Sequence, residues 1–297
     1  MDHSFSHYLL AKQSVDDRAL NRHVYERLAA SLPGEGLSIV EVGAGIGTML
    51  VRLLRWGLLS QAEYILVDEL AENIAYAADW IPAWAKENRL HVEKMPSNRL
   101  HLFSDTQNVY ISLEQADVFD FIQRKPEPAD LLIAHAFLDL LPMPESLRGL
   151  FSLVKKNGLA WLTINFDGVT TFEPVIDTEL DQKIERLYHQ SMDTRPTGGD
   201  SQAGRHLFGH LAGLGAQIQA AGSSDWVVHA QNGKYPADEA YFLNFILHFF
   251  ESSLAGQTGL DSDVFADWLA KRKRQIEYGE LVYIAHQMDF LVKPAGV

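Results

Sequence analysis

The residues best suited to chemistry form a short glycine-rich stretch after an apolar run. The sequence IVEVGAGIGTML covers residues 39–50 and contains Glu41, followed by Gly43, Gly45 and Gly47. A strand that ends in a glycine turn and leads into a helix presents free backbone N–H groups, and glycine lets a ligand approach closely. The stretch therefore predicts a ligand-binding turn.

The spacing of the glycines separates two classes of ligand. The dinucleotide fingerprint needs glycines at the first, third and sixth positions of G-x-G-x-x-G. Counted from Gly43, the third position is Gly45, but the sixth position is Thr48. This departure weakens the interpretation as an NAD(P)-dependent oxidoreductase, which stays open as the enzymatic alternative.

The pattern E-x-G-x-G-x-G resembles motif I of the class I S-adenosylmethionine-dependent methyltransferases. The resemblance implies that the turn lies against the amino-acid and ribose part of S-adenosylmethionine. The turn residues concerned are Glu41, Gly43, Ala44, Gly45 and Gly47. The chain follows the family motif by motif over residues 38–166 and by topology alone over residues 205–297.

Acidic residues further along the chain extend the resemblance. Asp68 ends the next apolar run, YILVD, and is followed by Glu69. The family carries an acidic residue at this place, which implies that Asp68 binds the ribose hydroxyls. Asp117 and Val118 stand where the family contacts adenine, although an Asp at either position could equally cap a helix. The long interval between Asp68 and Asp117 indicates an extra element near residues 89–107, which would shift the adenine assignment.

The stretch LLIAHAFLDLLP is similar to motif IV of the same family. The similarity implies that Ala134 and His135 face the cofactor. His135 is the candidate general base, because imidazole titrates near neutral pH and the residue follows a central strand. The alternative is that His135 packs on the cofactor. A base is needed only if the acceptor is a hydroxyl or an acidic carbon, since the methyl group is already activated.

Several other side chains are weaker candidates. His206 and His210 share one helix face, but Leu207 replaces the Glu of a zinc-protease motif, so no metal site is expected. Tyr8 and Arg18 could close over the cofactor from the N-terminus. Two further groups could line an acceptor site or serve as a turn and as core: Ser223, Ser224, Asp225 and Trp226, and the aromatic residues Tyr241, Phe242, Phe245, Phe249 and Phe250.

The elements that must position these residues alternate along the chain. Short apolar runs and helical patterns follow one another from Ser38 onward, which predicts a doubly wound α/β fold with a mostly parallel sheet. The resemblance implies a Rossmann-like methyltransferase fold with seven strands, the last of them antiparallel. Helical additions are expected at the N-terminus and in a lid.

The pattern divides the chain into two parts. Residues 1–36 are predicted to form an N-terminal helical lid segment, and residues 37–297 the S-adenosylmethionine-binding methyltransferase domain. Within the domain, residues 167–204 interrupt the alternation and contain the loop-like stretch TRPTGGDSQAGRH, so we expect an inserted lid there. A helix at residues 238–254 is a second addition.

The bulk composition excludes several classes of function. The formal net charge of -14 disfavours a nucleic-acid-binding protein, and only KRKR at residues 271–274 forms a basic cluster. The chain contains no cysteine, which excludes disulfides and thiolate sites. No signal peptide and no apolar run of membrane-spanning length is visible, so we expect a cytoplasmic protein without a membrane partner.

These observations predict methyl transfer from S-adenosylmethionine to a small-molecule acceptor. The sequence leaves open whether oxygen, nitrogen or carbon is methylated, and whether the aromatic residues near 241–250 support a homodimer. A non-catalytic protein that binds S-adenosylmethionine and uses the fold for interaction is the remaining alternative.

Overall fold

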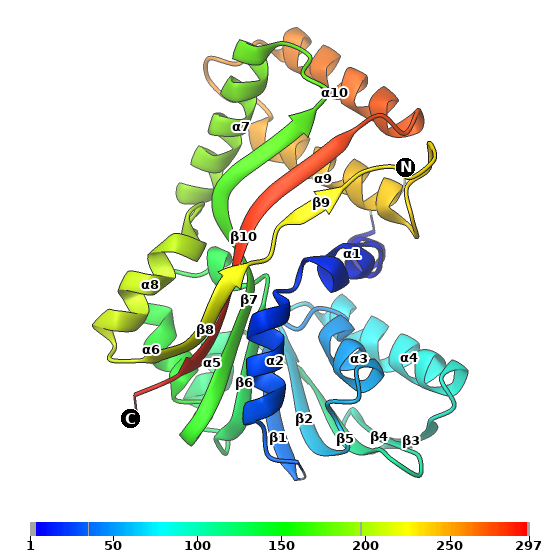
Figure 1. Ribbon diagram of the computed structural model, residues 1–297, viewed down its shortest axis with the longest axis vertical. Coiled ribbons are helices and arrows are strands. Elements are labelled where there is room, and N and C mark those ends of the chain that lie inside the picture. The colour runs from blue at the N-terminus through cyan, green and yellow to red at the C-terminus, as the bar shows by residue number, and fades with distance from the viewer. Residues whose placement is uncertain (1–3, 35, 197, 296–297) are drawn as a thin grey trace.

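A mixed sheet forms the centre of the molecule, and helices cover both of its faces (Figure 1). The computed structural model describes residues 4–34, 36–196 and 198–295. The parts of the predicted segments at residues 1–3, 35, 197 and 296–297 lie outside the described residues.

The helices follow the predicted pattern closely. In chain order they are α1 (Phe5–Ala19), α2 (Arg22–Ser31), α3 (Thr48–Arg55), α4 (Ala71–Glu87), α5 (Val118–Gln123), α6 (Glu145–Phe151), α7 (Thr178–Asp193), α8 (Ala203–Gly213), α9 (Glu239–Leu254) and α10 (Ser262–Glu277), with a 3-10 turn η1 (Leu138–Leu140). The N-terminal helical stretch is divided at Leu20 and Asn21, and the Asn21 side chain caps α2 by accepting a hydrogen bond from the Val24 amide.

The strands run in an order that is characteristic of a doubly wound sheet. They are β1 (Leu37–Val42), β2 (Gln61–Asp68), β3 (His91–Met95), β4 (Arg99–Phe103), β5 (Asn108–Gln115), β6 (Ala129–His135), β7 (Val154–Glu173), β8 (Gln217–Ser223), β9 (Trp226–Val228) and β10 (Val282–Lys293). Their order is β3-β4-β5-β2-β1-β6-β7-β10-β8, and β9 also pairs with β10.

The predicted fold class is confirmed, with more strands than expected. The central strands β5, β2, β1, β6 and β7 are parallel, and β10 is antiparallel to both β7 and β8. These seven strands match the prediction, but the sheet has ten strands within the described residues. The antiparallel β3–β4 hairpin is the extra element expected near residues 89–107. The strand β9 begins at Trp226, in the segment for which the sequence left an acceptor site or a turn open.

Two apolar clusters explain why the sheet is covered on both faces. Successive residues of a strand face opposite sides, so Ile39 packs with α2, α3 and α4 while Val40 packs with α5, α6 and α8. The first helix group supplies residues such as Leu28, Leu50 and Ile74, and the second supplies Phe121, Leu150 and Leu211. Both clusters include the buried strands of the parallel core, which accounts for their nearly continuous apolar sequence.

The strands β7 and β10 continue beyond the parallel core into an upper lobe. In Figure 1 this lobe consists of their upper halves with β9, α7, α9 and α10, while α1 lies between the lobe and the sheet. Residues 167–173 therefore belong to β7, whereas the sequence reading placed them in the lid segment. The reason is that Asp167-Gly168 reads as a turn: Gly168 has a φ of 71° and a register shift falls there, but β7 pairs with β10 again from Thr170 to Glu173.

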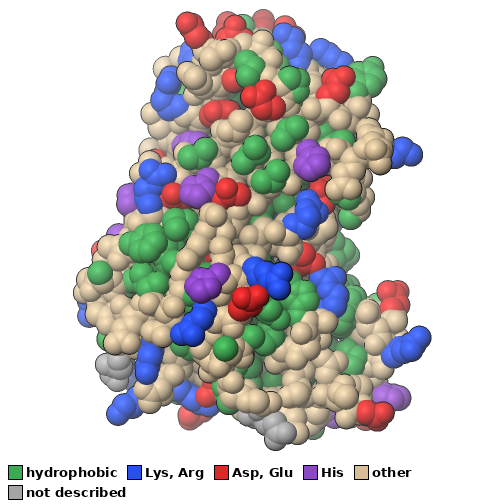
Figure 2. Space-filling model, viewed as in Figure 1, with side chains coloured by type: hydrophobic (Ala, Val, Ile, Leu, Met, Phe, Trp, Pro, Cys, Tyr) green, Lys and Arg blue, Asp and Glu red, His purple; other side chains and the backbone are tan. Residues whose placement is uncertain are grey.

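Charged side chains of both signs are mixed on the surface. On the face drawn in Figure 2, Lys and Arg side chains are interspersed with Asp and Glu. Within the KRKR cluster, Arg272 is fully buried and pairs with Asp181 at 3.0 Å, so the cluster does not form a continuous basic patch. Among the described residues, no helix is both long enough and apolar enough to cross a membrane.

Candidate functional site

The glycine turn lies at the carboxyl end of β1 and adopts a left-handed backbone conformation. The φ angles of Gly43, Gly45 and Gly47 are 61°, 56° and 81°, a region that side-chain-bearing residues rarely adopt. A Cβ atom on Gly43 would lie 2.2 Å from Cδ2 of Phe137, so the position excludes a side chain. The turn thus requires glycine for its backbone shape and, at Gly43, for the close contact.

The carboxylate of Asp68 lies beside this turn at the end of the neighbouring strand β2. Its Oδ2 accepts a hydrogen bond from the Gly45 amide at 2.7 Å, and its Oδ1 accepts from the Leu70 amide at 3.0 Å and from Asn73 Nδ2 at 2.9 Å. Burial raises the pKa of Asp68, while these donors act in the opposite direction. These hydrogen bonds hold the Asp68 carboxylate against the glycine turn that follows β1.

Glu41 is buried at the end of β1 and contributes a second acidic group. Its Oε2 accepts a hydrogen bond from the hydroxyl of Tyr64 at 2.5 Å. Burial raises the pKa of Glu41 to about 8, although the Tyr64 hydroxyl and Arg52 lower it. At neutral pH this carboxyl is therefore largely protonated, and it can donate as well as accept a hydrogen bond.

A cavity of about 490 Å³ joins these groups. It opens at the carboxyl ends of the parallel strands, where doubly wound sheets bind their ligands. The predicted site residues that line it are Glu41, Gly43, Ala44, Gly45, Asp68, Glu69, Asp117, Val118 and His135. Four strand ends that are far apart in the sequence thus contribute to one wall.

Two predicted residues do not line the cavity. Gly47 stands at the N-cap position of α3, where its left-handed conformation starts the helix. Ala134 is fully buried within β6, next to His135. Both residues contribute the backbone path beneath the cavity, and neither forms part of its wall.

Asp117 has a structural partner of its own. Its Oδ1 accepts hydrogen bonds from the amides of Phe119 at 2.8 Å and Asp120 at 3.2 Å, which makes it the N-cap of α5. The residue also lines the cavity next to Val118. The two interpretations of the sequence, a helix cap and a cavity residue, therefore apply together.

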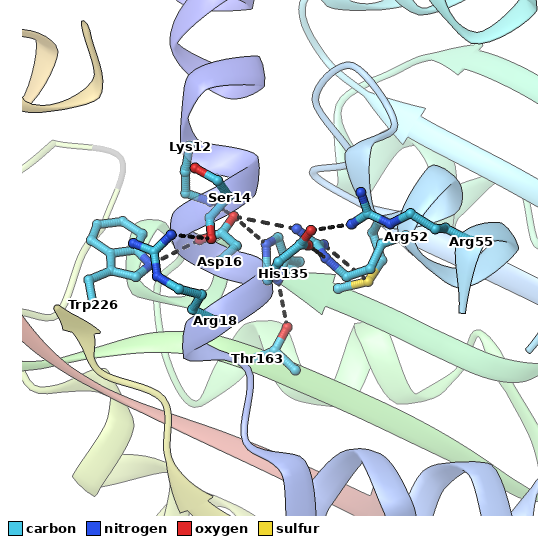
Figure 3. A network of polar contacts seen from close by, with 11 residues as sticks. Lys12, Ser14, Asp16, Arg18, Arg52, Arg55, His135, Thr163 and Trp226 are labelled. Atoms are coloured by element: carbon cyan, nitrogen blue, oxygen red, sulfur yellow. Dashed lines mark hydrogen bonds and ion pairs between the residues drawn. The ribbon is translucent and has the colours of Figure 1, made fainter. Parts of the chain in front are cut away.

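His135 belongs to a buried network centred on Asp16 of α1 (Figure 3). The ring contacts Asp16 Oδ2 through Nε2 at 2.9 Å and the Thr163 hydroxyl through Nδ1 at 2.8 Å. Asp16 also accepts from Lys12 at 2.8 Å and, through Oδ1, from Trp226 at 2.9 Å. Both ring nitrogens of His135 are thus engaged inside the protein.

The charge state of this network follows from its burial and its partners. Burial lowers the pKa of His135 to about 4, and Lys12 acts in the same direction, although Asp16 opposes them. Burial alone would raise the pKa of Asp16, but Lys12, His135 and Arg52 bring it well below the usual range. At neutral pH the network therefore holds a neutral imidazole beside an ionised carboxylate. In this tautomer Nε2–H donates to Asp16.

Several cavity residues were missed by the sequence reading. Helix α1 covers the cavity with Phe5, Leu9 and Lys12, while Phe137 follows β6 and Arg195 follows α7. Lys12 and Asp16 are four residues apart, the usual spacing for an ion pair on a helix, so their pairing could be predicted from the sequence. Nothing in that spacing indicates that they lie over the cavity.

The weaker candidates are distributed over different parts of the molecule. Arg18 pairs with Glu239 at 2.5 Å and does not line the cavity, whereas Tyr8 lines a neighbouring cavity. His206 contacts Asp200, and the ring centroids of His206 and His210 are 6.2 Å apart. Among the described residues, no group of three or more His, Cys, Asp or Glu side chains could hold a metal ion.

The aromatic residues of α9 and the polar segment at residues 223–226 also lie in different surroundings. Phe242, Phe245 and Phe250 are core residues, while Tyr241 stacks on His7 and Phe249 lines the neighbouring cavity. In the polar segment, Ser224 is buried, Asp225 bonds to His286 at 2.7 Å, and Trp226 reaches Asp16.

Comparison with known proteins bears on the fold. No protein-family model and no curated protein sequence matches this chain. The structure is similar to that of BH2331 from Bacillus halodurans C-125, described as a "putative methyltransferase", with a TM-score of 0.51 at 10% identity over 93% of this chain and 100% of that chain. A coclaurine N-methyltransferase bound to N-methylheliamine and S-adenosylhomocysteine gives a TM-score of 0.45 at 12% identity over 91% and 70% of the two chains.

The similarity to the Bacillus structure extends over the whole of that protein. It establishes the methyltransferase-type Rossmann-like fold for this chain, in agreement with the order of the strands. At 10% identity the chemistry must be argued from the site itself.

Proposed function

We propose that this protein is an enzyme that transfers a methyl group from S-adenosylmethionine to a small-molecule acceptor. The observation that carries the proposal is the convergence of the glycine turn, Asp68 and Asp117 on one cavity at the carboxyl edge of the sheet. Each of these features comes from a different strand end, and their meeting in one cavity supports the proposal.

The residues present suit S-adenosylmethionine in shape and charge. The turn at Gly43 and Gly45 gives close access to backbone, and Asp68 provides carboxylate oxygens for the two ribose hydroxyls. Asp117 and Val118 border the part of the cavity where adenine would lie. Lys12 lines the same cavity with its charge paired to Asp16 at 2.8 Å. When bound, the cofactor supplies a methyl group already activated on a sulfonium.

The chain itself would contribute binding, alignment and exclusion of water. Alignment and desolvation are the main sources of acceleration for such a transfer. Helix α1 would act as a lid over the cavity, as proposed for residues 1–36, and the segment 167–204 would contribute Arg195 to the same cover. Both nitrogens of His135 are bonded within the protein. We therefore infer that this residue holds α1 in position over β6 and does not transfer a proton.

The small-molecule class of the acceptor is inferred from the enclosed shape of the site. The dinucleotide alternative keeps one argument, the glycine turn itself, but Thr48 begins α3 at the position of its last glycine. The cytoplasmic location, the homodimer and the absence of nucleic acid as a partner remain predictions from sequence. They do not enter the choice of cofactor.

Isothermal titration with S-adenosylhomocysteine, S-adenosylmethionine and NADH tests the proposal. We expect binding of both sulfur ligands and a loss of about 100-fold or more in affinity for Asp68→Ala, because the ribose hydroxyls would lose a charged partner. Asp105→Ala is the matched control: Asp105 is exposed between β4 and β5 and does not line the cavity, so this variant should bind both ligands normally. Binding of NADH alone would return the site to the dinucleotide class.

A further inference from the structure

A second cavity of about 340 Å³ adjoins the proposed cofactor cavity. The two share a border formed by Phe5, Leu9, Lys12, Ala136, Leu140 and Arg195. Its floor includes Ile164 and Phe166 of β7, so it lies over the same edge of the sheet. A molecule in this cavity would therefore meet the cofactor across the shared border.

The walls of the second cavity are rich in aromatic rings. Tyr8, Phe166, Tyr188, Phe249 and Tyr283 line it. The rings are held by one another: Tyr8 stacks on Phe245 with centroids 4.5 Å apart, and Tyr188 stacks on Phe250 at 3.8 Å. Such a set of fixed ring faces and edges suits a flat aromatic ligand.

Two hydrogen-bond acceptors line this cavity. The amide of Gln287 is 2% exposed, and its Oε1 has no hydrogen-bond partner among the described residues. A buried acceptor without a partner costs about 1–3 kcal/mol, so a ligand that donates to it gains that energy. Asp139, partly buried after β6, is the second acceptor and brings a carboxylate to the same cavity.

The charges around Asp139 determine what it can recognise. Burial raises its pKa, while Arg195 and Lys12 lower it and Asp200 raises it further. Lys12 is already paired with Asp16 at 2.8 Å, so Arg195 is the principal cation facing Asp139. The phenols of Tyr8 and Tyr188 face the same carboxyl group and are neutral, because burial raises their pKa values. An anionic ligand would be repelled by the Asp139 carboxylate, whereas a neutral donor could form a hydrogen bond with it.

We propose that the second cavity binds the methyl acceptor and selects a neutral hydroxylated aromatic compound, whose hydroxyl groups donate to Asp139 and Gln287. The inference rests on the proposed function, since it takes the neighbouring cavity as the cofactor site. Aromatic walls supply the affinity, and the two acceptors distinguish a hydroxylated ring from a plain one. Arg195 balances the charge of Asp139 at the border between the cavities.

The test is a binding comparison of three related probes, made with the full chain saturated with S-adenosylhomocysteine. The probes are 4-nitrophenol, 4-nitroanisole and 4-nitrobenzoate, titrated by calorimetry below the pH at which the nitrophenol ionises. We expect 4-nitrophenol to bind about tenfold or more tightly than 4-nitroanisole, because only the phenol can donate a hydrogen bond to Asp139 and Gln287. We expect 4-nitrobenzoate to bind more weakly than the phenol.

Two variants assign this preference to the cavity. Asp139→Asn should reduce the ratio of the phenol and anisole affinities by about tenfold, while affinity for S-adenosylhomocysteine stays unchanged. Gln287→Met, which replaces an unpartnered amide by an apolar side chain of similar length, should fold normally and also lower the ratio. Asp105→Asn is the control for the loss of one negative charge and should leave the ratio of the phenol and anisole affinities unchanged.

The outcomes separate this inference from the function on which it rests. Equal affinities for phenol and anisole, or a preference that survives both variants, overturn the inference while S-adenosylhomocysteine still binds. Tightest binding of 4-nitrobenzoate, lost in Arg195→Gln, would overturn it in favour of an acidic acceptor. If Arg195→Gln weakens S-adenosylhomocysteine, the border residue belongs to the cofactor site and the charge argument fails. Absence of S-adenosylhomocysteine binding refutes the proposed function itself.

Discussion

The proposed cofactor cavity and the second cavity share a border, but the floor of the first is built differently from the walls of the second. The floor consists of turns that directly follow β1, β2, β5 and β6, so each of its residues belongs to a short local motif. The second cavity takes side chains from α1, β7, α7, β9, α9 and β10, which are spread from Phe5 to Gln287. The comparison shows that backbone-defined sites can be recognised from short motifs, whereas side-chain-defined sites depend on the whole fold.

The largest expected effect comes from the network that joins the two regions. Asp16→Asn leaves Lys12 and the buried ring of His135 without their charged partner, so we expect a loss of about 4 kcal/mol in the free energy of unfolding. Urea unfolding measures this loss. The control Asp79→Asn removes an exposed carboxylate that pairs with Lys94 and should change stability by less than about 1 kcal/mol. A loss no larger than the control's would show that α1 is held by packing alone.

The next effect concerns the glycine turn and separates its two requirements. Gly43→Ala suffers both the left-handed backbone and the contact with Phe137, so we expect about 3 kcal/mol of destabilisation and weaker binding of S-adenosylhomocysteine. Gly57→Ala has a similar φ of 71° with nothing near the added Cβ, and should cost about 1 kcal/mol. Equal losses in the two variants, measured by urea unfolding, would remove the close contact from the argument.

A pH experiment examines the network from the side of His135. The pKa of His135 falls from 6.5 in the unfolded state to about 4 in the folded state. The unfolded state therefore binds more protons between these values, and the protein loses stability as the pH is lowered through that range. We expect the wild type to lose about 2 kcal/mol from this residue between about pH 7 and pH 5. In urea unfolding at both pH values, His135→Gln should lack this part of the loss. An unchanged pH dependence in the variant would mean that the pKa of His135 is the same in the folded and unfolded states.

The smallest effect distinguishes the two contributions of Asp117. Serine is as good an N-cap as aspartate, so Asp117→Ser should keep the stability of α5 within about 0.5 kcal/mol. The cavity contact is lost, and we expect affinity for S-adenosylhomocysteine to fall by about threefold, equivalent to less than 1 kcal/mol. Asp117→Ala should show both losses. Full affinity in both variants would limit Asp117 to capping.

The parallel core and the floor of the site could be predicted because local sequence and backbone geometry agree there. Buried strands such as β1 and β6 are continuous apolar runs, and glycines mark the turn where side chains are excluded. The length of β7 could not be predicted, since the irregularity at Asp167-Gly168 reads as the end of the strand, whereas pairing with β10 resumes at Thr170. Lys12 and Arg195 could not be assigned to the cavity, because their positions depend on how distant helices pack.

The pairing of β7 with β10 also has a mechanical consequence. The two strands are hydrogen-bonded from the parallel core, at Ala160 and Val292, to the upper lobe, at Glu173 and Val282. This ladder, with register shifts between Ala285 and Gln287 and between Met288 and Phe290, connects the lobe to the sheet, so separating the two would break main-chain hydrogen bonds. Helix α1 is attached by side chains and a short connection at Leu20 and Asn21. Moving α1 away from the cavity would therefore break side-chain contacts such as that of Asp16 with His135, but no strand ladder.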